Sequence, residues 1–155
     1  MAYDYASNLP SRPERAAVNL PRDSEGNTYL HELIRKDAPV ALIREAIEQL
    51  GANVNATNKK NMPPLGMAIQ QNRPEVIACL VDCGAEMFFP VNKDTFFNAV
   101  YMAADTGRDA ALKMLLEKGG GLYANSPGMT QDGRSAPWTP LHIAVKTYHY
   151  GLIAP

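Results

Sequence analysis

The thiol and imidazole side chains that could act as nucleophile, base or zinc ligand are few, and most are far apart in the chain. They are two cysteines and three histidines: Cys79, Cys83, His31, His142 and His149. A thiol beside an imidazole could form a nucleophile and base. A reactive thiol needs an electropositive, partly open site, however, and Cys79 and Cys83 lie four residues apart on the apolar face of an expected helix. A zinc site needs three or four converging ligands, and these five scattered residues do not suggest one. We therefore expect no catalytic residue, no metal and no cofactor.

Motifs and charge exclude several other functions. The sequence has no glycine-rich phosphate loop, no H-E-x-x-H, no C-x-x-C and no nucleophile elbow. The 15 basic and 16 acidic residues give a net charge of −1, which argues against nucleic acid, because phosphate binding depends on clustered Lys and Arg. No apolar run reaches the roughly 18 residues of a membrane span, and a signal peptide pattern is missing. We expect a cytoplasmic protein of a reducing compartment that is not an enzyme and binds neither nucleic acid nor membrane.

A repeated pattern organises most of the chain. The motif Thr139-Pro140-Leu141-His142 returns in altered form around Leu30, Leu65 and Val100, so that successive copies are 35, 35 and 41 residues apart. A second marker, a glycine followed by a small residue, keeps the same phase and recurs at Gly51, Gly84 and Gly119. Two markers in one register indicate that the chain is built from copies of one unit.

Self-similarity at about 33 residues with the pattern T-P-L-H-x-A is typical of ankyrin repeats, and the chain resembles that family from about Asp23 to its C-terminus. The resemblance implies an all-α ankyrin-repeat solenoid of helix-turn-helix-hairpin repeats. Each helix pair would stack on its neighbours to bury a shared core. The copies are uneven, since Pro63 replaces the motif threonine, and Gly66 and Tyr101 replace the motif histidine.

The expected organisation is an N-terminal arm or cap, three full repeats and part of a fourth. Prolines in the first segment prevent a continuous helix there. The boundaries are 1–22 for the arm, about 23–56, 57–89, 90–124 and 132–155 for the repeats, and about 121–138 for a loop insertion. Since the chain stops where the second helix of the fourth repeat should begin, we expect further C-terminal sequence or a capping partner.

Apolar spacing, with proline at helix starts and glycine at helix ends, predicts two helices in each full repeat. The expected helices are Tyr29–Arg35, one opened by Pro39, Leu65–Gln71, Glu75–Asp82, Ala99–Asp105 and Asp109–Glu117. We expect Gly51 to end the first pair in a left-handed conformation. In the last helix, Leu112, Leu115 and Leu116 are expected to point into the core.

The resemblance also implies roles for single residues. His31 and His142 fall on the motif histidine position. In the family, the histidine ring at this position bridges backbone and turn groups. Asn55 lies at a position that is hydroxylated by an asparaginyl hydroxylase in many ankyrin repeats. A hydrogen bond within the hairpin is the more ordinary role of Asn55.

The resemblance places partner binding on the concave side of the stack, formed by the hairpin tips and the exposed face of each first helix. Carried over by register, the candidate contacts are Lys59, Lys60, Met62, Met67, Gln70, Phe88, Phe89, Met102, Asp105, Tyr123, Arg134, Trp138 and Lys146. The same register assigns to this side Glu32, Arg35, Lys36, Gln71, Thr106, Ile143 and Thr147.

Aromatic and arginine side chains carry most of the energy of typical interfaces. The expected anchors are therefore Phe88, Phe89, Tyr123, Arg134 and Trp138. An alternative interpretation is that the phenylalanines around residues 88–97 merely fill space under a lengthened hairpin.

We expect a protein-protein interaction module that binds a partner polypeptide in the concave groove. The alternative is the substrate-recognition or targeting part of a longer multidomain enzyme, for example a bacterial effector that acts in the cytosol or nucleus of a eukaryotic host cell. A free-standing cysteine hydrolase is the least favoured interpretation.

Overall fold

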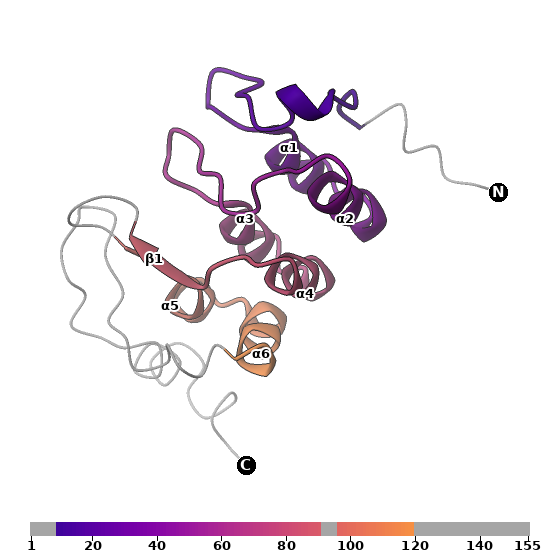
Figure 1. The fold of residues 1–155 in the computed structure, drawn as a ribbon. Helices are drawn as coiled ribbons and strands as arrows, with labels where there is room; N and C mark the ends of the chain where they lie inside the picture. The colour runs from indigo at the N-terminus through magenta and orange to yellow at the C-terminus, as the bar shows by residue number, and fades with distance from the viewer. Residues whose placement is uncertain (1–8, 91–95, 120–155) are drawn as a thin grey trace, which may run out of the picture.

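The computed structural model describes residues 9–90 and 96–119, which form three stacked helix pairs (Figure 1). The elements are η2 (Arg15–Ala17), α1 (Tyr29–Arg35), α2 (Val40–Glu48), α3 (Pro64–Gln70), α4 (Pro74–Asp82), β1 (Phe88–Pro90), β2 (Phe96–Asn98), α5 (Ala99–Asp105) and α6 (Asp109–Glu117). The six helices expected from the sequence are confirmed within about one residue. The expected insertion at 121–138 and the partial fourth repeat lie outside the described residues.

Proline and left-handed residues explain where the helices begin and end. Pro64 and Pro74 occupy the first turn of α3 and α4, where the missing N–H would have no helical partner. Gly51 follows α2 with φ of 79°, as expected, because glycine adopts this conformation without a steric penalty. The turn between the two helices of each pair also uses a left-handed residue, at Asp37, Asn72 and Gly107 in turn.

The helices pack in two columns. α1, α3 and α5 contact one another in order, and α2, α4 and α6 form the second column beside them (Figure 1). Between the columns lie fully buried aliphatic side chains, among them Leu33, Ile34, Ile69, Leu80 and Leu115. Because one helix pair cannot enclose such a core alone, the stack is the folding unit.

The orientation of Leu116 differs from the sequence-based expectation. Leu112 and Leu115 are buried, but Leu116 is 44% exposed. Ala111, Leu112 and Leu115 form the buried face of α6, and Leu116, about 100° round the helix from Leu115, lies just beyond that face. The expectation that all three leucines point inward was wrong for Leu116.

A short hairpin precedes α5. β1 and β2 pair antiparallel with Phe89 opposite Phe97, and the two rings lie 5.5 Å apart between centroids. Phe89 is only 9% exposed. The ring of Phe89 therefore fills space within the hairpin, whereas Phe88 is half-buried. A contact of either ring with a partner stays a prediction.

The segment before α1 packs onto the first helix pair. Val18 is buried in the core, and Arg12 forms an ion pair with Glu45 of α2. The side chain of Asn19 bonds to the backbone of Gly51 and Asn53, just after α2. These contacts join residues 12–19 to the second column of helices.

Candidate partner-binding surface

The turns that precede α1 and α3 have the same internal construction. The Oδ1 atom of Asp23 accepts hydrogen bonds from the backbone N–H groups two and four residues later, at 2.9 and 3.0 Å. The Oδ1 atom of Asn58 does the same in the next repeat, at 2.9 and 3.1 Å. Such bonds let a short polar side chain fix a turn. The backbone of each turn is thus set by one buried or half-buried acceptor.

Neighbouring turns are bonded to each other. Asn58 donates from Nδ2 to Oδ1 of Asn27 at 2.9 Å, and the backbone N–H of Lys59 donates to the carbonyl of Glu25 at 2.8 Å. These bonds use main-chain groups and the two amide side chains of Asn27 and Asn58. The charged side chains of Lys59 and Lys60 stay exposed to solvent.

His31 has the structural role that the resemblance implied. Its Nδ1 atom accepts from the backbone N–H of Thr28 at 3.2 Å, so Nε2 carries the proton and donates to the carbonyl of Met62 at 2.9 Å. Burial lowers the pKa of His31 below its usual 6.5, although the Met62 bond acts in the opposite direction. A neutral, fully bonded ring joins the start of α1 to the next turn.

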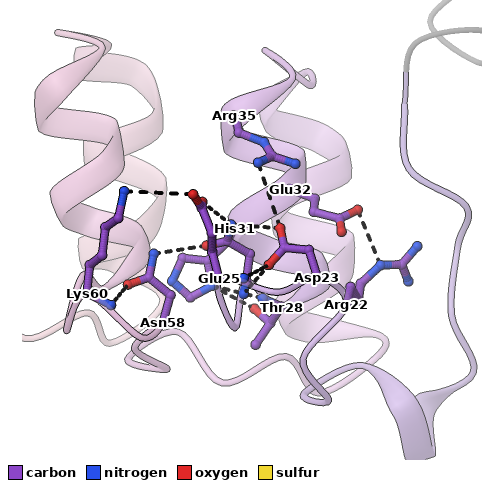
Figure 2. Close-up of polar contacts among 10 residues, drawn as sticks. Arg22, Asp23, Glu25, Thr28, His31, Glu32, Arg35, Asn58 and Lys60 are labelled. Carbon is purple, nitrogen blue, oxygen red and sulfur yellow. Dashed lines mark hydrogen bonds and ion pairs between the residues drawn. The ribbon is translucent and has the colours of Figure 1, made fainter.

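Ion pairs surround the first turn, as Figure 2 shows. Arg35 lies 3.8 Å from Asp23, and Lys60 lies 3.8 Å from Glu25. Glu32 pairs with Arg22 at 3.3 Å and its side chain is only 14% exposed. Glu32, which the register assigned to the exposed side of the stack, is instead held by Arg22 against the preceding segment.

The exposure of the candidate contact residues separates them into groups. The exposed ones are Lys59, Lys60, Gln70 and Asp105. The half-buried ones are Met62, Met67, Phe88 and Met102, and the buried one is Phe89. Tyr123, Arg134, Trp138 and Lys146 lie outside the described residues, as do His142 and His149.

Met62 has a packing role that the sequence did not indicate. A Cβ atom at Gly66 would overlap the Met62 sulfur, so the methionine fills the space beside this glycine. Gly66 holds the motif histidine position, and the Met62 carbonyl receives the bond from His31 of the previous repeat. The sequence feature that could have indicated this packing is the combination of glycine at 66 with a long apolar residue, methionine, at 62.

The two thiols lie on α4. Cys79 is buried and Cys83 is half-buried. Burial raises the pKa of Cys79 to about 11, and a protonated thiol is a poor nucleophile. Within residues 9–90 and 96–119, no three His, Cys, Asp or Glu side chains come close enough to hold a metal ion.

The side chain of Asn55 bonds to the next repeat, whereas within its own turn its backbone N–H donates to Oδ1 of Asn53 at 3.0 Å. Its Nδ2 donates to the carbonyl of Gly84 at 3.3 Å, and its Oδ1 accepts from the backbone N–H of Glu86 at 2.9 Å. Hydroxylation of Asn55 stays a prediction.

Comparison with known proteins agrees with this geometry. The profile of the ankyrin repeats, in three copies, matches residues 30–127. The crystal structure of the human ASB11 ankyrin repeat domain superposes with a TM-score of 0.66 at 20% identity. The match covers 88% of this chain and 55% of that one, so the chain spans little more than half of the solved domain.

The chain belongs to the ankyrin-repeat family. Ankyrin repeats in general are protein-protein interaction modules and typically non-catalytic. In the part of the chain that the structure describes, no helix is long and apolar enough to cross a bilayer. The cellular compartment and a further enzymatic domain stay predictions.

Proposed function

We propose that this chain binds a partner polypeptide through one side of the stack, called here the inner surface. It consists of the turn tips at residues 22–27 and 57–62, the β1–β2 hairpin, and the exposed face of α1, α3 and α5. In Figure 1 these turns project beside the α1, α3 and α5 column, away from α2, α4 and α6.

The observation that carries the proposal is that the groups that hold the turns together differ from the side chains that face solvent. Main-chain groups and buried amides hold the turns together, which leaves the side chains of Lys59, Lys60 and Gln70 exposed. On the same surface, Met67 and Met102 are half-buried. Exposed polar groups around partly covered apolar ones are typical of an interface with a polar rim.

A photo-crosslinking residue tests the proposal. It replaces Gln70 on α3 or, as the matched control, Glu48 on α2; both positions are exposed, so both variants should fold. We expect the Gln70 position to capture a discrete partner from a cytosolic extract and the Glu48 position to capture none.

The identified partner should then bind purified protein, and the changes Lys60→Ala and Asp105→Ala should weaken that binding. Capture through Glu48 alone would contradict the proposal and move the site to the second column. The anchors Trp138 and Arg134 stay predictions, with at least a tenfold loss expected for Trp138→Ala, equal to about 1.4 kcal/mol. Phe89 is a poor test residue, because truncating a buried ring disturbs the hairpin itself.

A further inference from the structure

We infer that the inner surface of the first two repeats binds an acidic polypeptide segment. The inference rests on the proposed function and names the chemistry of the partner at that surface. Four cationic side chains carry it. They are Arg35 and Lys36 at the end of α1, and Lys59 and Lys60 in the turn before α3.

Three of these cations border the same turn. Arg35 reaches Asp23 and Lys60 reaches Glu25, and both carboxylates belong to the turn before α1. Figure 2 shows Asp23 and Glu25 between the side chains of Arg35 and Lys60. Lys59 lies against the same segment, because its backbone N–H bonds to the carbonyl of Glu25 and its side chain is next to Gly26. Lys36 directly follows Arg35 at the end of α1.

Most carboxylates near these cations are already engaged. Both oxygens of Asp23 accept hydrogen bonds inside its own turn, and these bonds lower the pKa of Asp23, so it stays ionised. Glu32 is held by Arg22. Asp37 contacts Arg73 at 3.2 Å. Glu25 is left as the main carboxylate facing the cations.

The contacts of Glu25 and Lys60 are loose enough to be exchanged. Their charged atoms are 3.8 Å apart, and the side chains are 52% and 74% exposed. An exposed ion pair of this kind contributes little to stability. Within the described residues, neither Lys36 nor Lys59 forms an ion pair. A carboxylate of a partner can therefore contact these groups at little cost.

An acidic polypeptide fits this surface better than nucleic acid does. These four cations lie on the first two repeats, and among the described residues the third repeat exposes Asp105 on the same surface. The whole chain carries a net charge of −1. Binding to a phosphate backbone depends on many basic contacts along its path, whereas a short run of Glu or Asp needs only a few.

The test uses three probes with the full chain: a peptide of alternating glutamate and alanine, the same peptide with glutamine for glutamate, and a single-stranded DNA oligonucleotide. Amide NMR shifts at low ionic strength measure affinity and location together. We expect the acidic peptide to bind best and to shift residues 35, 36, 59 and 60. Added salt should weaken binding, because exposed charges are screened.

Two variants with opposite expected effects distinguish a change in surface charge from a loss of folding. Lys59→Glu should weaken binding of the acidic peptide by roughly fivefold, and Glu25→Gln should strengthen it. The bond between the turns uses the main-chain N–H of Lys59, so the first variant should fold. Lys113→Glu on α6, which makes the same charge change at an exposed site, should leave affinity unchanged.

Several results would overturn the inference. They are equal binding of the glutamine peptide, tighter binding of the oligonucleotide, no binding at low ionic strength, or equal weakening by Lys113→Glu. If the partner captured through Gln70 binds the Lys59→Glu variant normally, the proposed function stands and the acidic character of the partner is wrong.

Discussion

Asn19 and Asn55 make the same pair of hydrogen bonds in consecutive units. Each donates from Nδ2 to the carbonyl of the glycine after the next second helix, Gly51 or Gly84, at 3.2 and 3.3 Å. Each also accepts at Oδ1 from the backbone N–H two residues beyond that glycine, at 2.6 and 2.9 Å. The segment before α1 therefore occupies the position of a preceding repeat and continues its bonds.

This equivalence predicts similar costs for two substitutions. Asn19→Ala and Asn55→Ala should each lower the free energy of unfolding by about 0.5–1.5 kcal/mol, the usual contribution of a hydrogen-bonded group. Urea denaturation followed by circular dichroism measures both. Thr57→Ala, at an exposed turn position, is the control and should change little. An unaltered midpoint for Asn19→Ala would mean that the first segment does not stabilise the stack.

The buried neutral ring of His31 predicts a loss of stability in mild acid. Its folded-state pKa lies below 6.5, so the unfolded chain binds the proton first and stability falls as pH drops below about 6.5. Stability from this group is fully present above that value. Protonation also turns Nδ1 from acceptor into donor, which breaks the bond from the Thr28 N–H.

Denaturant midpoints measured between neutral pH and pH 5 check this expectation. His31→Gln should be less stable than the parent at neutral pH, yet its midpoint should depend less on pH in this interval. The carboxyl group of Asp23 affects stability only at lower pH, because its pKa lies below 3.8. An equally steep pH dependence in the variant would assign the effect to other groups.

The two neighbouring leucines of α6 predict unequal costs. Leu112 is 5% exposed and Leu116 is 44% exposed. Leu112→Ala should cost roughly 2–5 kcal/mol, since it leaves a cavity in the core. Leu116→Ala should cost on the order of 0.5 kcal/mol, as at other surface sites. The difference between the two denaturation midpoints is the measurement, and equal midpoints would contradict the orientation of α6.

The sequence predicted the helices because their signals are local. Proline at the start of α3 and α4 and glycine after α2 act on their own turns. The contact of Asn19 with the first helix pair depends on a residue 34 positions away, although the shared dipeptide Val-Asn at 18–19 and 54–55 was a usable signal. Likewise, periodicity did not separate Leu115 from Leu116, since Leu116 lies just past the edge of the apolar stripe that contains Leu115.

On the candidate surface, the exposure of single residues was predictable from the sequence, but their packing contacts were not. Register placed Lys59, Lys60 and Gln70 on exposed sites, because turn and helix phase decide exposure. Register gave no sign that Arg22 would cover Glu32 or that Phe97 would cover Phe89, because these contacts join segments through packing.

The last prediction concerns the thiols of α4, which should differ in reactivity. Cys79 is buried and has a pKa of about 11, so near pH 8 it is almost entirely protonated and reaches reagent only when the stack opens. Cys83 is half-buried and should react first with a thiol reagent such as Ellman's. Cys79→Ser and Cys83→Ser assign the two phases, and neither should change partner affinity by more than a few-fold. Rapid labelling of Cys79 in the folded protein would contradict its burial and reopen the question of a reactive cysteine.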